Sequence, residues 1–132
     1  MGYLDTNVSF VARPAMPGNE TPPSIMRKIV WLDDSVFPGA PYFDCVWFFK
    51  KRDPNPPAHT HDFDEIIGFI GSDPEDPGNL NGTVEFVLDG ETLKITRSTM
   101  IYIPAGVPHC PFSITELEKP ILHFSGGPGK RY

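Results

Sequence analysis

The chain has 132 residues, of which 39% are hydrophobic and 21% charged, and its formal net charge is −6 at pH 7. This length and composition fit one globular domain. The acidic balance argues against a nucleic-acid partner, because contacts to phosphates need a basic face. The sequence has no apolar run that could cross a bilayer and no basic start followed by an apolar stretch. We therefore expect no membrane partner, no signal peptide and a cytoplasmic location.

The composition favours short strands over long helices. Sixteen prolines and twelve glycines are present, and proline interrupts both helices and central strands. The two cysteines, Cys45 and Cys110, are too few for a disulfide framework. We expect both to be thiols in a reducing compartment.

The N-terminal part of the chain divides into an arm and the first strands. Residues 1–24 are polar and contain several prolines, so we expect an arm there and a single β-barrel domain over residues 25–132. Residues 24–32 fit a strand or a short helical turn. Residues 42–51 are rich in aromatics and predict a strand. Residues 53–57 contain three prolines and predict a turn.

The remaining elements are also short. The ranges 59–61, 65–70, 83–88, 91–95, 99–103, 110–115 and 120–125 each predict a strand. Asp89-Gly90 predicts a hairpin turn between two of them. Residues 71–82 read as an acidic, solvated loop, with a lid over a cavity mouth as the alternative. Eight to ten short strands predict an all-β sandwich or barrel, which can hold one small ligand.

The most informative pattern is His59-Thr60-His61 followed by Glu65. On an extended chain these three side chains share one face, because side chains alternate across a strand. Imidazole nitrogens and a carboxylate oxygen are ligands of divalent transition metals. His109 follows a Pro-x-Gly turn and could supply a fourth ligand. The competing interpretation is a satisfied polar network without a metal, which we disfavour because unpaired buried polar groups are costly.

These residues resemble the two motifs of the cupin superfamily over about residues 42–125. The first motif is matched by His59, His61 and Glu65, and the second by Pro104, Gly106 and His109. There are departures from the pattern. The glycine before the first histidine is absent, the glycine after the glutamate comes one residue early, Arg97-Ser98 stands where a glycine opens the second motif, and Ser113 replaces its last asparagine. None of these departures removes a ligand.

The resemblance implies a small jelly-roll barrel in which His59, His61, Glu65 and His109 bind one divalent transition metal, such as Fe, Mn, Ni or Zn. Four protein ligands leave coordination positions open to a substrate. The expected function is a metal-dependent enzyme acting on a small, oxygen-rich, chelating molecule. Dioxygenase, decarboxylase, isomerase and lyase chemistry all remain open. The alternative is a non-catalytic module that binds or senses a small ligand, although a sensor usually needs an output domain.

Three further side chains are candidate catalytic residues. Ser113 has the same parity as His109 and could line the same cavity. His123 lies in the apolar run 121–124, where a core role is favoured over a catalytic one. Tyr102 lies between two isoleucines and could simply pack in the sheet.

Neighbours of the ligands carry weaker predictions. Cys110 follows His109 directly and should point to the opposite face, which makes it a poor ligand. Asp62 and Asp64 have the opposite parity to the ligands, so we read them as solvated or as partners of a ligand histidine. Exposed strand edges and an aromatic-rich strand predict a homodimer, with residues 1–24 crossing between subunits.

Overall fold

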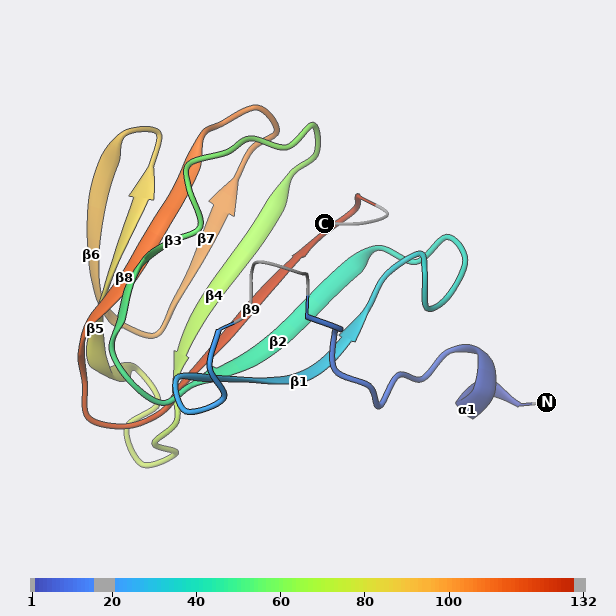
Figure 1. Ribbon diagram of the computed structural model, residues 1–132, viewed down its shortest axis with the longest axis horizontal. Helices are drawn as coiled ribbons and strands as arrows, with labels where there is room; N and C mark the ends of the chain where they lie inside the picture. The colour runs from blue at the N-terminus through green and yellow to red at the C-terminus, as the bar shows by residue number, and fades with distance from the viewer. Residues whose placement is uncertain (1, 16–20, 130–132) are drawn as a thin grey trace.

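Two antiparallel sheets face one another in this computed structural model, which describes residues 2–15 and 21–129 (Figure 1). One sheet has the strand order β1-β2-β9-β4-β7, and the other has the order β3-β8-β5-β6. The elements are α1 (Tyr3–Thr6), β1 (Met26–Leu32), β2 (Tyr42–Phe48), β3 (Arg52–Asn55), β4 (Glu65–Gly71), β5 (Asn79–Leu88), β6 (Glu91–Arg97), β7 (Thr99–Ile103), β8 (His109–Leu117) and β9 (Ile121–Gly127). The prediction of an all-β jelly-roll barrel is confirmed.

The core lies between the two sheets and is rich in aromatic side chains. Phe48, Phe69 and Phe86 are at most 1% exposed. Phe112 joins them from β8, with ring centroids 5.9 Å from Phe48 and 5.2 Å from Phe69. Burying a side chain of this size contributes roughly 1.5–3 kcal/mol. These phenylalanines come from both sheets, so they hold the two layers together.

The hairpin predicted at Asp89-Gly90 joins β5 to β6. Leu88 pairs with Glu91, and both turn residues have positive φ, 49° at Asp89 and 80° at Gly90. This is the backbone of the two-residue turns that match strand twist, and glycine and aspartate tolerate it well. The prediction is confirmed here because the turn residues alone determine the geometry.

Two local predictions are wrong. The turn predicted at residues 53–57 is largely strand β3, in which Arg52 pairs with Ile114 and Asn55 with Phe112. Proline is tolerated there because β3 is an edge strand, where a missing N–H breaks no ladder. The strand predicted at 59–61 is only an isolated bridge at His59.

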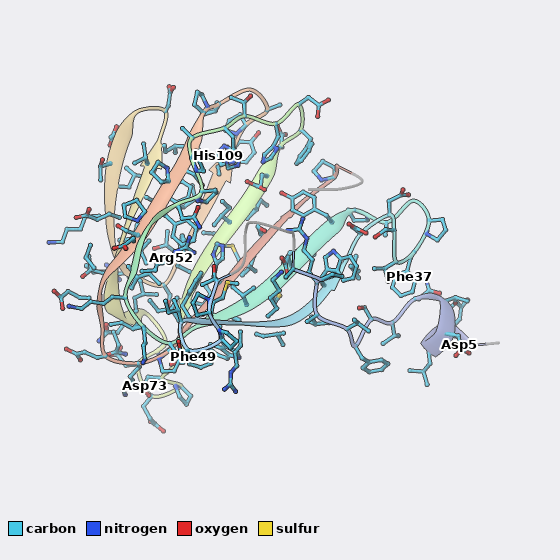
Figure 2. The ribbon with its side chains drawn as sticks, viewed as in Figure 1. Asp5, Phe37, Phe49, Arg52, Asp73 and His109 are labelled. Atoms are coloured by element: carbon cyan, nitrogen blue, oxygen red, sulfur yellow. The ribbon has the colours of Figure 1, made fainter. Side chains whose placement is uncertain are left out.

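The acidic loop is shorter than predicted and does not cover the site. Gly71 ends β4 and Asn79 begins β5, so only residues 72–78 connect them. Leu80, placed in the loop by its polar neighbours, is fully buried. Figure 2 shows Asp73 at the opposite end of the barrel from His109. This position favours the solvated loop over a lid on the histidine cluster.

The described part of the N-terminal arm lies against the edge strand β1. The backbone N–H of Trp31 donates to the carbonyl of Val11 at 3.0 Å, and Oγ of Ser9 donates to the carbonyl of Trp31 at 2.6 Å. Farther out, Tyr3 is 82% exposed and Phe10 is 75% exposed. No helix in the described residues is long and apolar enough to span a membrane.

The outer face of the five-stranded sheet is apolar. Its exposed side chains include Ile29, Phe43, Ile66, Met100 and Tyr102. Ile66 and Tyr102 are direct cross-strand partners on β4 and β7. The solvated face of an antiparallel sheet is usually polar, so this face is unusual for an isolated barrel.

Candidate metal centre

Three histidine side chains meet at one end of the barrel, where Figure 2 labels His109. Their potential ligand atoms, in His59, His61 and His109, lie within 4.8 Å of one another. His59 and His109 form a bridge in which each backbone N–H donates to the other residue's carbonyl, at 3.1 and 3.0 Å. The bridge ties the segment before β4 to the start of β8, and the two rings lie 4.4 Å apart between centroids.

Glu65 completes the cluster from the facing sheet. It is the first residue of β4 and is 1% exposed. Its Oε1 lies 3.2 Å from Nε2 of His109, and its Oε2 lies 3.9 Å from Nε2 of His61. The structure thus brings the four predicted ligands together. The reason differs from the prediction, because the chain bends between His61 and Glu65 instead of continuing as one strand.

Backbone carbonyls fix the orientation of two of the rings. Nδ1 of His59 donates to the carbonyl of Pro57 at 2.8 Å, and Nδ1 of His109 donates to the carbonyl of Val107 at 3.0 Å. A carbonyl only accepts, so Nδ1 carries the proton in each ring. Nε2 of the neutral ring is then a bare lone pair available to a metal.

The buried atoms of His109 and Glu65 fit a cation between them. Neither Nε2 of His109 nor Oε1 of Glu65 has a hydrogen-bond partner in the described part of the chain, although 3.2 Å separates them. With the proton on Nδ1, two lone pairs face each other there, which is costly in a buried site without a positive charge between them. Three imidazole nitrogens and a carboxylate oxygen suit a divalent transition metal. The residues present therefore fit the metal that the motifs imply.

The protonation states depend on burial and on the close contacts. Burial lowers the pKa of His109, but the Glu65 carboxylate beside it outweighs this, so the pKa is raised above that of an ordinary histidine. Burial raises the pKa of Glu65, but contacts with His109 and Tyr42 outweigh it, so the carboxyl stays ionised at neutral pH. Burial lowers the pKa of His61, which keeps that ring neutral.

Tyr42 is a site residue that the sequence analysis missed. Its hydroxyl donates to Oε2 of Glu65, and its side chain is 2% exposed. Tyr42 begins β2 and faces inward like Val46 and Phe48. Its parity therefore predicts an inward side chain, but the sequence does not show that β2 lies close enough to the start of β4 for this contact.

Asp64 holds the turn that precedes His109. Its Oδ1 accepts from the backbone N–H of Ala105 at 2.9 Å. The N–H of Gly106, which has φ of 81°, donates to the carbonyl of His61 at 2.8 Å. The prediction that Asp64 is solvated is confirmed, because its side chain is exposed, but its hydrogen bonds give it a second role that the sequence did not show. It positions the second motif against the first.

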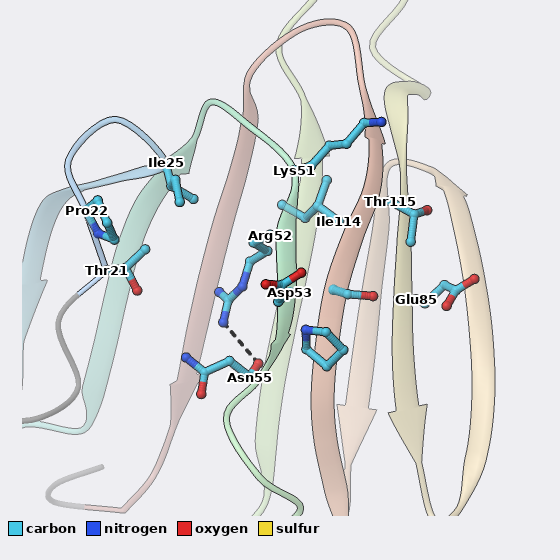
Figure 3. Close-up of a pocket in the computed structure, with 12 residues that line it drawn as sticks. Thr21, Pro22, Ile25, Lys51, Arg52, Asp53, Asn55, Glu85, Ile114 and Thr115 are labelled. Carbon is cyan, nitrogen blue, oxygen red and sulfur yellow. Dashed lines mark hydrogen bonds between the residues drawn. The ribbon is translucent and has the colours of Figure 1, made fainter.

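Two of the three candidate catalytic residues lie away from the cluster. Tyr102 is 59% exposed on the outer face, and its hydroxyl donates to Oδ2 of Asp64 at 3.2 Å. Ser113 lines an outer groove with Glu85 and Thr115, drawn in Figure 3. The expectation that Ser113 shares the cavity of His109 is wrong.

A bulge in β8 explains the misplaced serine. Leu88 pairs with His109 and Phe86 pairs with Phe112, so two steps on β5 match three on β8. Cys110 occupies the bulge with φ of 74°. The extra residue reverses the alternation that follows, so Phe112 packs in the core and Ser113 does not. Cys110 itself is buried and is not in the histidine cluster.

His123 lies inside the barrel but deeper than the cluster. Its Nδ1 donates to the carbonyl of Gly68 at 2.9 Å, and its ring stacks on Phe69 with centroids 4.6 Å apart. Burial lowers its pKa to about 4. The ring is therefore neutral at pH 7 and is packed like a core residue, as the sequence favoured.

No protein-family model matches the chain, and a search of the curated proteins finds no match. Among solved structures, an oxalate oxidase in complex with the substrate analogue glycolate is similar with a TM-score of 0.55 at 17% identity, over 86% of this chain and 55% of that one. KdgF from Halomonas sp. has a TM-score of 0.50 at 16% identity, over 83% and 84% of the two chains. An RmlC-like cupin from Shewanella frigidimarina NCIMB 400 has a TM-score of 0.47 at 15% identity, over 80% and 76%.

The similarities to the oxalate oxidase and to KdgF agree with the two-sheet architecture. The chain spans just over half of the oxalate oxidase and most of KdgF. The protein has the cupin fold, and it carries a histidine cluster with the spacing of a metal site. At these identities the similarity concerns the fold alone, and the reaction has to be argued from the site.

Proposed function

We propose that the protein is a metal-dependent cupin enzyme that acts on a small, oxygen-rich molecule able to chelate the metal. One observation carries this proposal. Nε2 of His109 and Oε1 of Glu65 are buried 3.2 Å apart, and neither has a hydrogen-bond partner in the described part of the chain. Nearby, His59 and His61 offer two more ligand atoms.

The chain's own residues would hold the metal and tune its ligands. Bound there, a divalent metal would act as a Lewis acid with positions open to substrate. The carbonyls of Pro57 and Val107 keep the ring protons on Nδ1 of two ligands. The Tyr42 hydroxyl binds the Glu65 oxygen that faces away from His109 and so orients the carboxylate. Such contacts to ligands adjust both metal affinity and geometry.

The reaction type stays open among dioxygenase, decarboxylase, isomerase and lyase chemistry. The likeness to an oxalate oxidase supports an enzyme that handles small oxygenated molecules, but it does not select the reaction. A non-catalytic module that binds or senses a small ligand through the same metal is the alternative. A chain that binds its ligand but leaves it unchanged would favour that alternative.

The first test is metal analysis of the purified protein, for which we expect about one equivalent per chain. Oxygen consumption and product analysis with 2-oxo acids, hydroxy acids and β-diketones then test for turnover. Preparations reconstituted separately with Fe, Mn, Ni and Zn identify the active metal. A protein that binds none of the four metals at micromolar concentration would refute the proposal.

We also propose that the protein is a homodimer. The apolar outer face and the exposed aromatic side chains of the arm, Tyr3 and Phe10, are both surfaces that water covers poorly. A second copy of the chain could cover both at once, with the arm of each subunit on the sheet of the other. Sedimentation or light scattering decides this, and a monomer at micromolar concentration would contradict it. Replacing Met100 by lysine should shift a dimer toward monomer, because it buries a charge in the interface.

A further inference from the structure

A glycine-rich segment at the end of β9 lies close to the proposed metal site. Strand β9 lies between β2 and β4, and it ends where both of them begin (Figure 1). Gly127 pairs with Tyr42, the first residue of β2, and Gly126 pairs with the second residue of β4. Residues 127–129, which we call the glycine tail, therefore lie next to the strand ends that carry Tyr42 and Glu65.

The half-buried side chain of Phe63 connects the glycine tail to a proposed ligand. Its ring stacks on the imidazole of His61, with the centroids 4.8 Å apart and the planes at 13° to one another. It also meets the ring of Tyr42 edge-on, with the centroids 5.6 Å apart. Tyr42 in turn binds the carboxylate of Glu65 through its hydroxyl. The stack on Phe63 limits the rotation of the His61 ring.

The glycine tail makes room for the Phe63 ring because it has no side chain at Gly129. A methyl group on Gly129 would lie 2.6 Å from Cδ1 and 2.7 Å from Cε1 of Phe63. Nonbonded carbon atoms pack at about 3.5–4.0 Å, so either the ring or the tail would have to move. The backbone N–H of Tyr42 donates to the carbonyl of Gly129 at 3.2 Å, which holds the tail on β2. This hydrogen bond favours movement of the ring.

Gly127 meets a backbone atom in addition to a ring. A methyl group on Gly127 would lie 2.5 Å from the carbonyl oxygen of Asp64 and 3.2 Å from Cε1 of Tyr42. A carbonyl oxygen cannot rotate away as a side chain can, so the methyl group would displace the backbone directly before Glu65. Gly78 offers a contrast, because a methyl group there would meet no atom of the described part of the chain within 4 Å.

We propose that the glycine tail and Phe63 position His61 as a metal ligand. This inference rests on the proposed function, because it explains how that site holds one of its ligands. The tail keeps the flat ring of Phe63 against His61, so the imidazole has a fixed orientation before a metal binds. A ligand that already has its bound orientation loses less conformational entropy on binding, which increases metal affinity. Phe63 is thus a positioning residue.

The first experiment observes the His61 ring in the metal-free protein. Protons that lie over the face of an aromatic ring resonate upfield, so loss of the stack should move the ring-proton resonances of His61 downfield. We expect this shift in Gly129→Ala and in Phe63→Ala. Gly78→Ala is the matched control and should leave the resonances in place. An NMR correlation of imidazole protons with their ring nitrogens, recorded at one fixed pH, measures the shift.

The second experiment measures Zn²⁺ affinity by competition with a chelator. Gly129→Ala and Phe63→Ala should each weaken binding by about tenfold, as is typical for contacts that orient a ligand. Phe63→Tyr keeps the flat ring and should keep the wild-type affinity, as should Gly78→Ala. The double variant of Gly129→Ala and Phe63→Ala should also lose only about tenfold, because the added methyl group acts by displacing a ring that is then absent.

The outcomes separate this inference from the proposed function. A Zn²⁺ affinity that is unchanged in Gly129→Ala overturns the role of the tail and leaves the metal site standing. Losses that multiply in the double variant also overturn it, because they would show that the tail does not act through Phe63. Displaced His61 resonances in a protein that binds no metal support the positioning of the ring and overturn the proposed function. If Phe63→Ala does not fold, Phe63→Leu takes its place, and an unchanged affinity in that variant would contradict a role of the flat ring.

Discussion

The barrel interior holds two histidine environments that differ in what faces Nε2. At His59, His109 and His123 alike, Nδ1 donates to a backbone carbonyl. Around His109 the other nitrogen meets a carboxylate and two more imidazoles. Around His123 the neighbours are phenylalanine rings and a guanidinium. The backbone contact fixes the tautomer in both environments, so the surroundings of Nε2 decide which ring can bind a metal.

The two environments also shift the pKa in opposite directions. The carboxylate beside His109 raises the pKa of that ring above its ordinary value despite burial. Burial lowers the pKa of His123 to about 4, and the small raising effect of the more distant Glu65 carboxylate does not compensate for it. A histidine that lines a cavity is therefore not evidence of a metal site by itself, and the carboxylate partner makes the difference.

Removing one of the proposed metal ligands should cause the largest loss of metal affinity. If the 10–16 kcal/mol typical of a structural zinc site is shared among four ligands, His61→Ala should weaken metal binding by about 100- to 1,000-fold. His123→Ala is the control from the other environment and should keep full occupancy. Metal content and competition with a chelator measure both variants. Equal loss in the two variants would erase the distinction between the two environments.

The acid stability of the protein should depend on His123. Its folded pKa of about 4 lies below the unfolded value, so the unfolded chain binds a proton first as the pH falls. The contribution of His123 to the free energy of unfolding is fully present above about pH 6.5. It is lost as the pH falls toward 4, and the loss amounts to about 3 kcal/mol. Urea unfolding at several pH values should show this loss in the wild type.

The variant His123→Phe should lack that part of the pH dependence, because phenylalanine does not titrate. In the metal-free protein, the contribution of His109 to the free energy of unfolding should change with pH in the opposite direction. Its raised pKa contributes stability below the unfolded pKa, and that contribution disappears as the pH rises through the folded value. A wild type whose stability does not change between pH 6.5 and 4 would contradict the assignment of His123 as a buried neutral ring.

Removing the hydroxyl that supports Glu65 should have a smaller effect. Tyr42→Phe keeps the ring and its burial but leaves Oε2 of Glu65 without that donor. Contacts of this kind change metal affinity by about 10- to 100-fold, and we expect the lower end because the ligand itself remains. The same chelator competition measures it. An unchanged affinity would show that the histidines alone hold the carboxylate in position.

Substitutions outside the barrel interior should have the smallest effect. Tyr102→Phe removes an exposed hydrogen bond to Asp64, and Ser113→Ala changes a side chain that faces the outer groove. Each should alter stability by no more than about 0.5 kcal/mol and leave metal content unchanged. A loss of turnover in either variant with metal retained would restore that residue as a catalytic candidate.

The sequence predicts which residues meet in the cluster, but it does not predict their surroundings. His59, His61, Glu65 and His109 can be read from local spacing and from the resemblance of two short motifs. The contact between Tyr42 and Glu65 depends on which strands become neighbours, and no local pattern encodes that.

Ser113 shows a second limit of reading the sequence. Alternation was the correct rule for β8, but the bulge at Cys110 shifted it by one residue. Leu80 shows a third limit, because one apolar side chain among polar neighbours was enough to extend β5 into the core. Long-range pairing and irregular backbone therefore account for the errors.

Glu65 begins a strand of the five-stranded sheet, and His109 begins a strand of the four-stranded sheet. A cation bound by both side chains would cross-link the two sheets at the end of the barrel where the histidine cluster lies. Binding of the metal should then slow amide hydrogen exchange at the first residues of both strands. Exchange at the opposite end of the barrel, around the connection formed by residues 72–78, should stay unchanged. The ion would thus stabilise the contact between the two sheets in addition to its role in catalysis.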